Sequence, residues 1–82
     1  MTKEIIEIIE KYLMMIDPEV EQEELADDLF KLSLLADSGE LSSLMVDAHT
    51  LAEYDKYEAH FYSTTKEKLL TEWNELKKKA GY

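Results

Sequence analysis

Residues 37–52 read DSGELSSLMVDAHTLA, and this stretch decides the fold class. Asp37-Ser38-Gly39 forms a short turn, of the length that folds one helix back on another. From Glu40 onward the apolar residues recur at the spacing of one helix face: Leu41, Leu44/Met45, Ala48 and Leu51/Ala52. A turn followed directly by such a stripe predicts two antiparallel helices that pack against each other.

The helix before this turn is expected to start at Asp17-Pro18-Glu19, the clearest boundary in the chain. Asp17 suits the N-cap and Pro18 the first helical position, and the acids that follow complement the helix dipole. We therefore expect a helix from this boundary to about Asp37. Its apolar face consists of Leu25, Leu29, Leu32 and Ala36, and Phe30 and Leu34 lie beside that face.

A first helix is expected from about Lys3 to Ile16, with Thr2 at its N-cap. Its apolar residues follow the helical period. The expected stripe consists of Ile5, Ile9, Tyr12 and Ile16, and is widened by Ile6 and Leu13.

The C-terminal part leaves two alternatives open. Thr64 with Glu67 three residues later is typical of a capping box, so a fourth helix is expected to begin there. No glycine or proline separates it from the third helix, however, so residues 40–80 are also compatible with one long helix. The last apolar stripe consists of Leu69, Trp73, Leu76 and Ala80. Three lysines at 77–79 and Gly81 mark the end of the helix.

These patterns predict an all-α fold, a small antiparallel bundle of three to four short helices, with residues 1–82 as a single helical domain. The apolar fraction of 45% is enough for a core, and no cysteine is present to form a disulfide. The chain has no signal-peptide pattern at its start and no apolar run of about 20 residues. We therefore expect a cytoplasmic protein with no membrane partner.

The charge balance restricts the partners. Nineteen acids stand against nine lysines, arginine is absent, and the formal net charge is −10. Only residues 63–82 carry more basic than acidic residues, with five lysines and three acids. A chain with this much negative charge repels the phosphate backbone of nucleic acid. Direct binding of nucleic acid is therefore not expected.

No catalytic, cofactor-binding or metal-ligating residue is assigned. The stretch DPEVEQEELADD at 17–28 has acids at alternate positions like a calcium loop, but it has proline second and lacks the glycine of the sharp turn. The chain's two histidines, His49 and His60, would lie about 16 Å apart on one helix, too far to share an ion. His49 and Glu53 are four residues apart, but two ligands do not make a site. We therefore expect that the protein is not an enzyme.

Residues 23–30, EELADDLF, carry the one resemblance to an enzyme family. Glu24 and Asp27 match the ExxD step of the MazG-like all-α nucleoside triphosphate pyrophosphohydrolases, which this segment resembles. The resemblance implies Mg²⁺-dependent attack on a nucleotide phosphate, with facing carboxylates from Glu4, Glu7 and Glu10. The chain departs from the family pattern because its upstream glutamates are not paired and the downstream phosphate-binding set is missing.

Aromatic residues are the remaining indication of function in the sequence. Tyr54, Tyr57 and Phe61 follow helical spacing, and tyrosine and tryptophan are favoured anchors of protein interfaces. We expect Phe61 and Trp73 in the core, and leave open whether the tyrosines belong to the core or to an interface.

The interpretation that these observations favour is a small acidic, non-enzymatic protein-binding module that docks on a basic surface of another protein. An inhibitor or nucleic-acid-mimicking regulator of bacterial or phage accessory type is its sharpest form. The candidate partner-binding residues are Glu21, Glu24, Asp28, Glu53, Tyr54, Tyr57 and Glu58. One alternative is a homo-oligomeric assembly protein, dimerising through a stripe on the third or fourth helix, with Met14, Met15 and Met45 adapting to the seam. The other is the Mg²⁺-dependent hydrolase.

Overall fold

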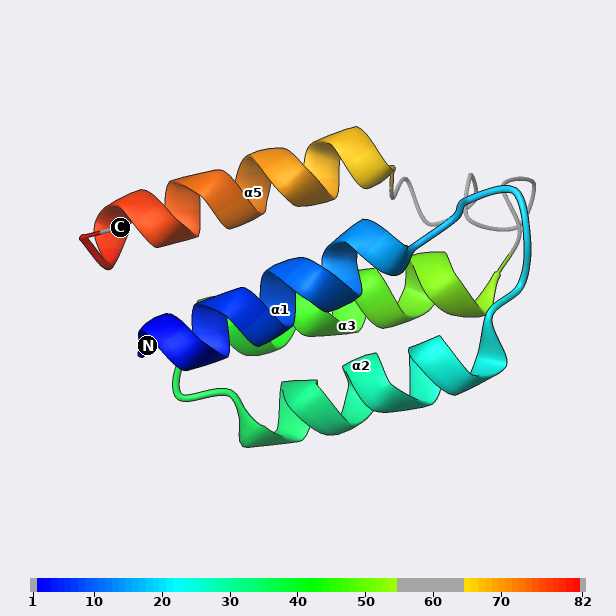
Figure 1. Cartoon of the computed structure of the whole chain (residues 1–82), viewed down its shortest axis with the longest axis horizontal. Coiled ribbons are helices and arrows are strands. Elements are labelled where there is room, and N and C mark those ends of the chain that lie inside the picture. Colours follow the sequence, from blue (N-terminus) through cyan, green and yellow to red (C-terminus); the bar gives the residue numbers. More distant parts are fainter. Residues whose placement is uncertain (1, 55–64, 82) are drawn as a thin grey trace.

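A computed structural model describes residues 2–54 and 65–81 of the chain, and these residues form four α-helices and no strand. The helices are α1 Lys3–Met15, α2 Glu23–Leu35, α3 Gly39–Glu53 and α5 Lys66–Lys79. Each described helix runs antiparallel to the one before it along the chain, and α3 lies behind α1 in Figure 1. The predicted all-α bundle is therefore confirmed. None of the described helices has the length and apolar character needed to cross a bilayer.

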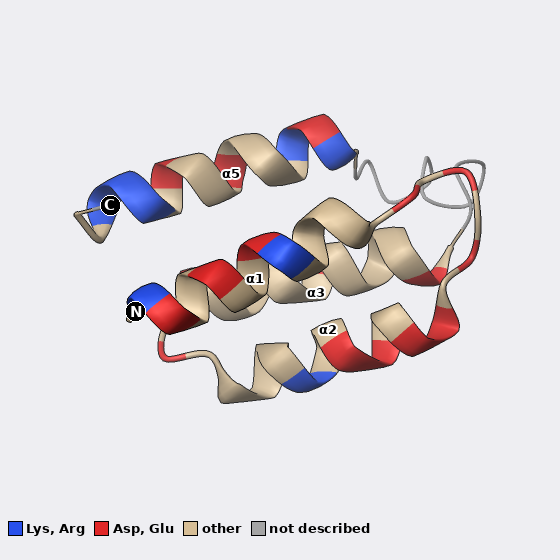
Figure 2. Ribbon diagram, viewed as in Figure 1, with Lys and Arg blue, Asp and Glu red and all other residues tan. Residues whose placement is uncertain are grey.

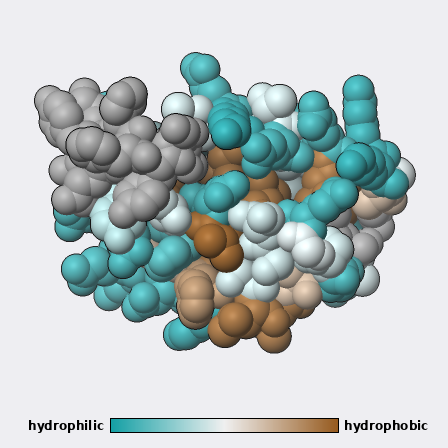
Figure 3. All heavy atoms as spheres, turned by 180° about the vertical axis from the view of Figure 1, so that it is seen from behind, coloured by the Kyte–Doolittle hydropathy of each residue, from teal (hydrophilic) through white to brown (hydrophobic). Residues whose placement is uncertain are grey.

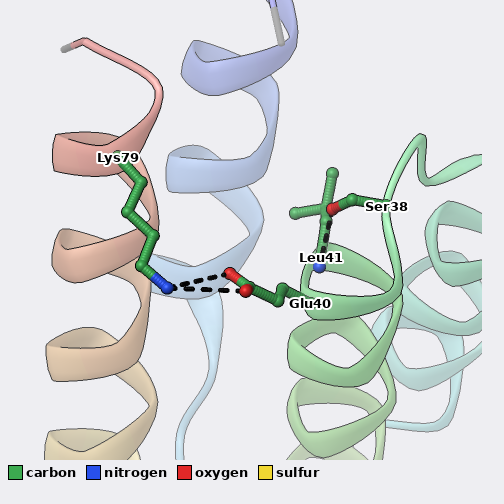
Figure 4. A network of polar contacts seen from close by, with 4 residues as sticks. All are labelled: Ser38, Glu40, Leu41 and Lys79. Atoms are coloured by element: carbon green, nitrogen blue, oxygen red, sulfur yellow. Dashed lines mark hydrogen bonds and ion pairs between the residues drawn. The ribbon is translucent and has the colours of Figure 1, made fainter.

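Helix α3 is the centre of the bundle. The whole apolar stripe predicted for it is buried, and no member is more than 4% exposed: Leu41, Leu44, Met45, Ala48, Leu51 and Ala52. The turn before it reverses the chain as predicted, and the Ser38 hydroxyl caps the helix by accepting from the Leu41 main-chain nitrogen at 3.2 Å (Figure 4). At the same end, Lys79 of α5 forms an exposed ion pair of 3.4 Å with Glu40.

The buried face of α1 matches the expected stripe in part. Thr2 caps the helix as predicted, accepting from the Ile5 main-chain nitrogen at 3.2 Å. Ile5 itself is 43% exposed, however, and Tyr12 is only half-buried. The residues that enter the core are Ile6, Ile9, Leu13 and Ile16. Apolar residues cover more than one face of α1, so packing rather than periodicity decides which face is buried.

The predicted start of α2 is wrong. Asp17 does not cap the helix: its Oδ1 accepts from the Glu19 main-chain nitrogen at 3.0 Å, within a separate turn. The helix begins at Glu23 instead, after Gln22. It also ends at Leu35, before the predicted Asp37, because the backbone at Ala36 is extended (φ −65°, ψ 138°). Residues 16–22 connect the end of α1 to the start of α2.

On α2 the predicted face is largely correct. Leu25, Ala26, Leu29 and Ser33 are buried, and Leu32 and Ala36 pack partly against the core. Phe30 and Leu34 remain 46% and 71% exposed.

Residues 40–80 do not form one long helix. Helix α3 ends at Glu53, since Tyr54 has an extended backbone (φ −111°, ψ 148°). Helix α5 is capped by Thr65, whose hydroxyl accepts from the Lys68 main-chain nitrogen at 3.1 Å, and not by the predicted Thr64, which lies outside the described residues.

Helix α5 buries the middle of its predicted stripe. Leu69 and Trp73 are 1% and 2% exposed, so the placement of the tryptophan in the core is confirmed. Leu76 packs partly against the core, whereas Ala80 is exposed because the helix ends there. Gly81 follows with a positive φ of 88°, which glycine adopts without the steric penalty of a side chain.

Candidate functional site

An open groove of about 580 Å³ lies between the end of α1 and the start of α2. Tyr12 and Met15 of α1 form one wall, and residues 21–25 with Asp28 form the other. Three of the predicted partner-binding residues line it, namely Glu21, Glu24 and Asp28. The groove thus combines apolar side chains with a rim of carboxylates.

A second hollow of about 320 Å³ lies beside the groove, between the start of α2 and the end of α3. Its lining includes the predicted Glu53 and Tyr54 and shares Glu21 and Glu23 with the groove. Five of the seven candidate residues therefore gather at one end of the bundle. The other two, Tyr57 and Glu58, lie outside the described residues.

Gln22 fixes the loop that forms this end. Its side-chain nitrogen donates to the Met15 carbonyl oxygen at 2.9 Å, and its side-chain oxygen accepts from the Asp17 main-chain nitrogen at 2.8 Å. Its own main-chain nitrogen donates to the Ala52 carbonyl oxygen at 2.7 Å. One residue therefore joins the last turn of α1, the loop and the last turn of α3.

The electrostatic character of this end comes from the sequence around it. Residues 17–28 contain seven acids and no lysine, and Figure 2 shows them along the loop and the first half of α2. No ion pair between described residues involves Glu21, Glu24 or Asp28. The nearby Lys66 ammonium binds main-chain carbonyls instead, lying 2.8 Å from the Ile16 oxygen.

The carboxylates implied by the hydrolase resemblance are not gathered. Glu24 and Asp27 lie on α2, but Glu10 of α1 is directed toward α5, where it bonds with the Lys77 ammonium and accepts from the Trp73 indole nitrogen at 3.3 Å. The Lys77 hydrogen bond is the main cause that lowers the pKa of Glu10 from its ordinary value of 4.5. Burial opposes this effect, and the Trp73 hydrogen bond adds to it. Within residues 2–54 and 65–81, no group of three histidine or acidic side chains is placed to hold a metal ion.

His49 joins α2 to α3 through Ala26 and Glu53, two residues that line the second hollow. Its Nδ1 lies 2.8 Å from the Ala26 carbonyl oxygen, which can only accept, so Nδ1 carries a proton. Its Nε2 lies 3.0 Å from a Glu53 carboxylate oxygen, and its ring lies 5.4 Å from that of Phe30. His49 is thus half-buried and links two helices; His60 lies outside the described residues.

The expected dimer seam is partly wrong. Met45 is fully buried in α3 and cannot contact a partner, whereas Met14 and Met15 are 64% and 51% exposed on α1. Val46 is the one large apolar side chain exposed on the described part of the third and fourth helices. The apolar surface is therefore concentrated on α1 and α2 rather than on α3 or α5. Phe61, expected in the core, lies outside the described residues.

Sequence reasoning missed the groove's apolar wall. Tyr12 was placed on the core stripe, and Met15 and Gln22 were not assigned to the site. The excess of apolar residues on α1 was the available indication, since one helix face cannot bury all of them.

No protein-family model, curated protein or solved structure matches this chain significantly.

Proposed function

We propose that this chain is a small non-enzymatic protein-binding module, cytoplasmic in location, that docks on a basic surface of another protein. The observation that carries the proposal is the groove at the start of α2, where an apolar wall from α1 lies opposite the carboxylates of Glu21, Glu24 and Asp28. These carboxylates attract lysine and arginine side chains, while the apolar wall offers area to bury.

The two components have different roles in binding. Carboxylates at a rim accelerate encounter with a positively charged surface and select against acidic partners, but each adds little affinity because water and salt screen it. Apolar side chains such as Tyr12 and Met15 supply affinity when a partner covers them. A groove with both features suits recognition better than an acidic surface alone.

The sharpest form of the proposal is an inhibitor or regulator of a nucleic-acid-binding protein, of the bacterial or phage accessory type. Closely spaced carboxylates on a helix resemble the negative charges of a phosphate backbone. The run from Glu21 to Asp28 presents five carboxylates in eight residues. Under this proposal the chain occupies the surface that would otherwise hold nucleic acid.

Matched charge variants test the proposal. Glu21→Gln, Glu24→Gln and Asp28→Asn together remove three charges from the groove. Asp47→Asn, Glu72→Gln and Glu75→Gln remove three charges from the hollow between α3 and α5. Both triple variants have the same net charge, so only the location of the lost charges differs.

The wild type and the two triple variants are each immobilised and used to capture partners from cell extract. The bound proteins are then identified by mass spectrometry. We expect the groove variant to lose a basic partner that the control variant retains, and about 0.5 M salt to release that partner from the wild type. Equal capture by both variants would show that the docking site lies elsewhere.

Self-association is a second candidate function, favoured by exposed apolar residues on the side of α2 that faces α3. Phe30 and Leu34 lie there, and Val46 lies one turn before His49, whose ring contacts Phe30. Figure 3 shows apolar side chains gathered over α2 on this side of the molecule. Light scattering at two concentrations tests it: a dimer that Leu34→Ser disrupts supports the candidate, and a monomer at high micromolar concentration excludes it.

A further inference from the structure

Helix α1 carries an apolar stripe that the core does not use. Ile5, Ile8, Tyr12 and Met15 follow i, i+3, i+7 and i+10 spacing, which places them along one side of the helix. Three of them are exposed, by 43% for Ile5, 48% for Ile8 and 51% for Met15. Because Tyr12 and Met15 form the groove wall that faces α2, the two isoleucines extend that wall toward the start of α1.

Helix α2 carries a matching stripe with the same spacing. Leu25 and Asp28 line the groove, and Leu32 and Leu35 follow them on the same side of the helix. Leu32 is half-buried and Leu35 is 81% exposed, the highest value among the large apolar residues described as exposed.

The antiparallel arrangement brings the two stripes opposite each other. Because α1 and α2 run in opposite directions (Figure 1), the start of α1 and the end of α2 lie at the same end of the bundle. The two stripes thus lead away from the groove at the acidic end, one along α1 and the other along α2. Ten residues of helix correspond to a length of about 15 Å.

We propose that this extended groove receives an amphipathic helix of a partner protein, with an apolar stripe of about three turns and basic residues beside it. This inference rests on the proposed function and names the partner's chemistry. The groove is the acidic docking site described above, extended along α1 and α2.

The shape of the groove favours a helix as its occupant. Two neighbouring antiparallel helices leave a furrow into which the side chains of a third helix pack, and residues at i, i+3, i+4 and i+7 of that helix reach both walls. The exposed side chains are long aliphatic ones, which suit such interdigitation.

The charges favour a basic occupant. Glu21, Glu23, Glu24 and Asp28 surround the wide end, and a lysine or arginine at the end of the bound helix reaches them. A second copy of this chain is disfavoured here because it would bring another formal charge of −10 to an acidic rim.

A synthetic peptide provides the probe. One peptide of about 14 residues carries leucines at i, i+3, i+4 and i+7, lysines on the flanks and alanines elsewhere, and is long enough to fill the groove. A second peptide has the same composition in scrambled order, so it keeps the charge but loses the apolar face. Binding to the full chain is measured by calorimetry, and helix formation by circular dichroism.

Two neighbouring leucines supply matched variants of the chain. Leu35 lies on the groove side of α2 and Leu34 on the side that faces α3, and both are at least 71% exposed, so replacing either leaves the core intact. We expect Leu35→Ser to weaken binding of the amphipathic peptide roughly tenfold, and Leu34→Ser to change it less than about twofold. Ile8→Ser, on the opposite wall, is expected to act like Leu35→Ser.

The expected result is that the amphipathic peptide binds about tenfold or more tightly than the scrambled one and becomes helical on binding. Equal binding of the two peptides would overturn the helix proposal, yet leave charge-driven docking intact. Equal effects of the Leu34 and Leu35 variants would also overturn it. If neither peptide binds, the helix proposal fails, while the capture experiment still decides the proposed function separately.

Discussion

The main-chain nitrogen of Gln22 donates to the carbonyl oxygen of Ala52 at 2.7 Å, which ties the residue before α2 to the last turn of α3. The side chain of Gln22 meanwhile bridges Met15 and Asp17. The position of the loop relative to both helices, and with it the shape of the candidate groove, therefore depends strongly on Gln22.

Replacing Gln22 by alanine is expected to destabilise the protein by about 1–2 kcal/mol, because it removes two side-chain hydrogen bonds and keeps the main-chain bond. Gln22→Glu keeps an acceptor for Asp17 but has no donor for Met15. Its free energy of unfolding should therefore fall by less than that of the alanine variant. Urea unfolding followed by circular dichroism measures both. Wild-type stability of the alanine variant would mean that the loop is held by other contacts.

Removing the cap of α5 tests where that helix begins. Thr65→Ala should lower the free energy of unfolding by about 1 kcal/mol, because the Lys68 main-chain nitrogen then loses its partner. Thr65→Ser keeps a hydroxyl and should lose much less. Thermal unfolding of both variants and of Thr64→Ala makes the comparison, and a larger loss for Thr64→Ala would contradict the assigned cap.

Trp73 is expected to be the most sensitive core position of α5. It is 2% exposed, so Trp73→Ala should cost roughly 3–5 kcal/mol, a large share of the stability of so small a domain. Trp73→Phe retains most of the apolar volume and should lose about 1–2 kcal/mol. Denaturant unfolding curves of the two variants give these values, and near-wild-type stability of the alanine variant would place the side chain outside the core.

The stability of the protein should depend on pH through Glu10. The pKa of Glu10 is lowered in the folded state, so its ionised form stabilises the fold above the unfolded-state pKa, and this contribution is lost as the pH falls through the folded pKa. At neutral pH, Glu10→Gln should therefore cost roughly 0.5–1 kcal/mol, since the pair is partly exposed. The difference from the wild type should shrink as the pH falls below 4.5.

Unfolding free energies measured from neutral to acidic pH test this expectation. Glu40→Gln is a suitable control, because the Glu40–Lys79 pair is more exposed and should contribute little. A difference between Glu10→Gln and wild type that stays constant across the pH range would contradict the role assigned to the Lys77 bond.

The sequence was sufficient to predict the helical class and the central helix. The stripe from Leu41 to Ala52 is buried because α3 contacts neighbours on several sides. Its apolar pattern therefore allows only one choice of buried face. The boundary at Asp17 was misplaced because its carboxylate satisfies a local turn as readily as a helix end, and a local motif does not reveal the distance that the loop must span.

The candidate site was only half predictable. Runs of acids at Glu21–Asp28 are visible in the sequence and do line the groove. The apolar wall was not foreseen, because Ile5 and Tyr12 have the same spacing as a core stripe and only packing decides which stripe is buried. Gln22 likewise has no distinctive pattern, since its three partners belong to three separate segments.

Under the proposed function, a partner docks in the groove between α1 and α2. The most direct measurement is a titration of the isotope-labelled full chain with the captured partner, following each main-chain amide by nuclear magnetic resonance. We expect the shifted signals to come from residues 5–28 and Leu35, and about 0.5 M salt to reverse the shifts. Shifts confined to the hollow between α3 and α5, around Asp47 and Glu72, with α1 and α2 unchanged, would contradict it.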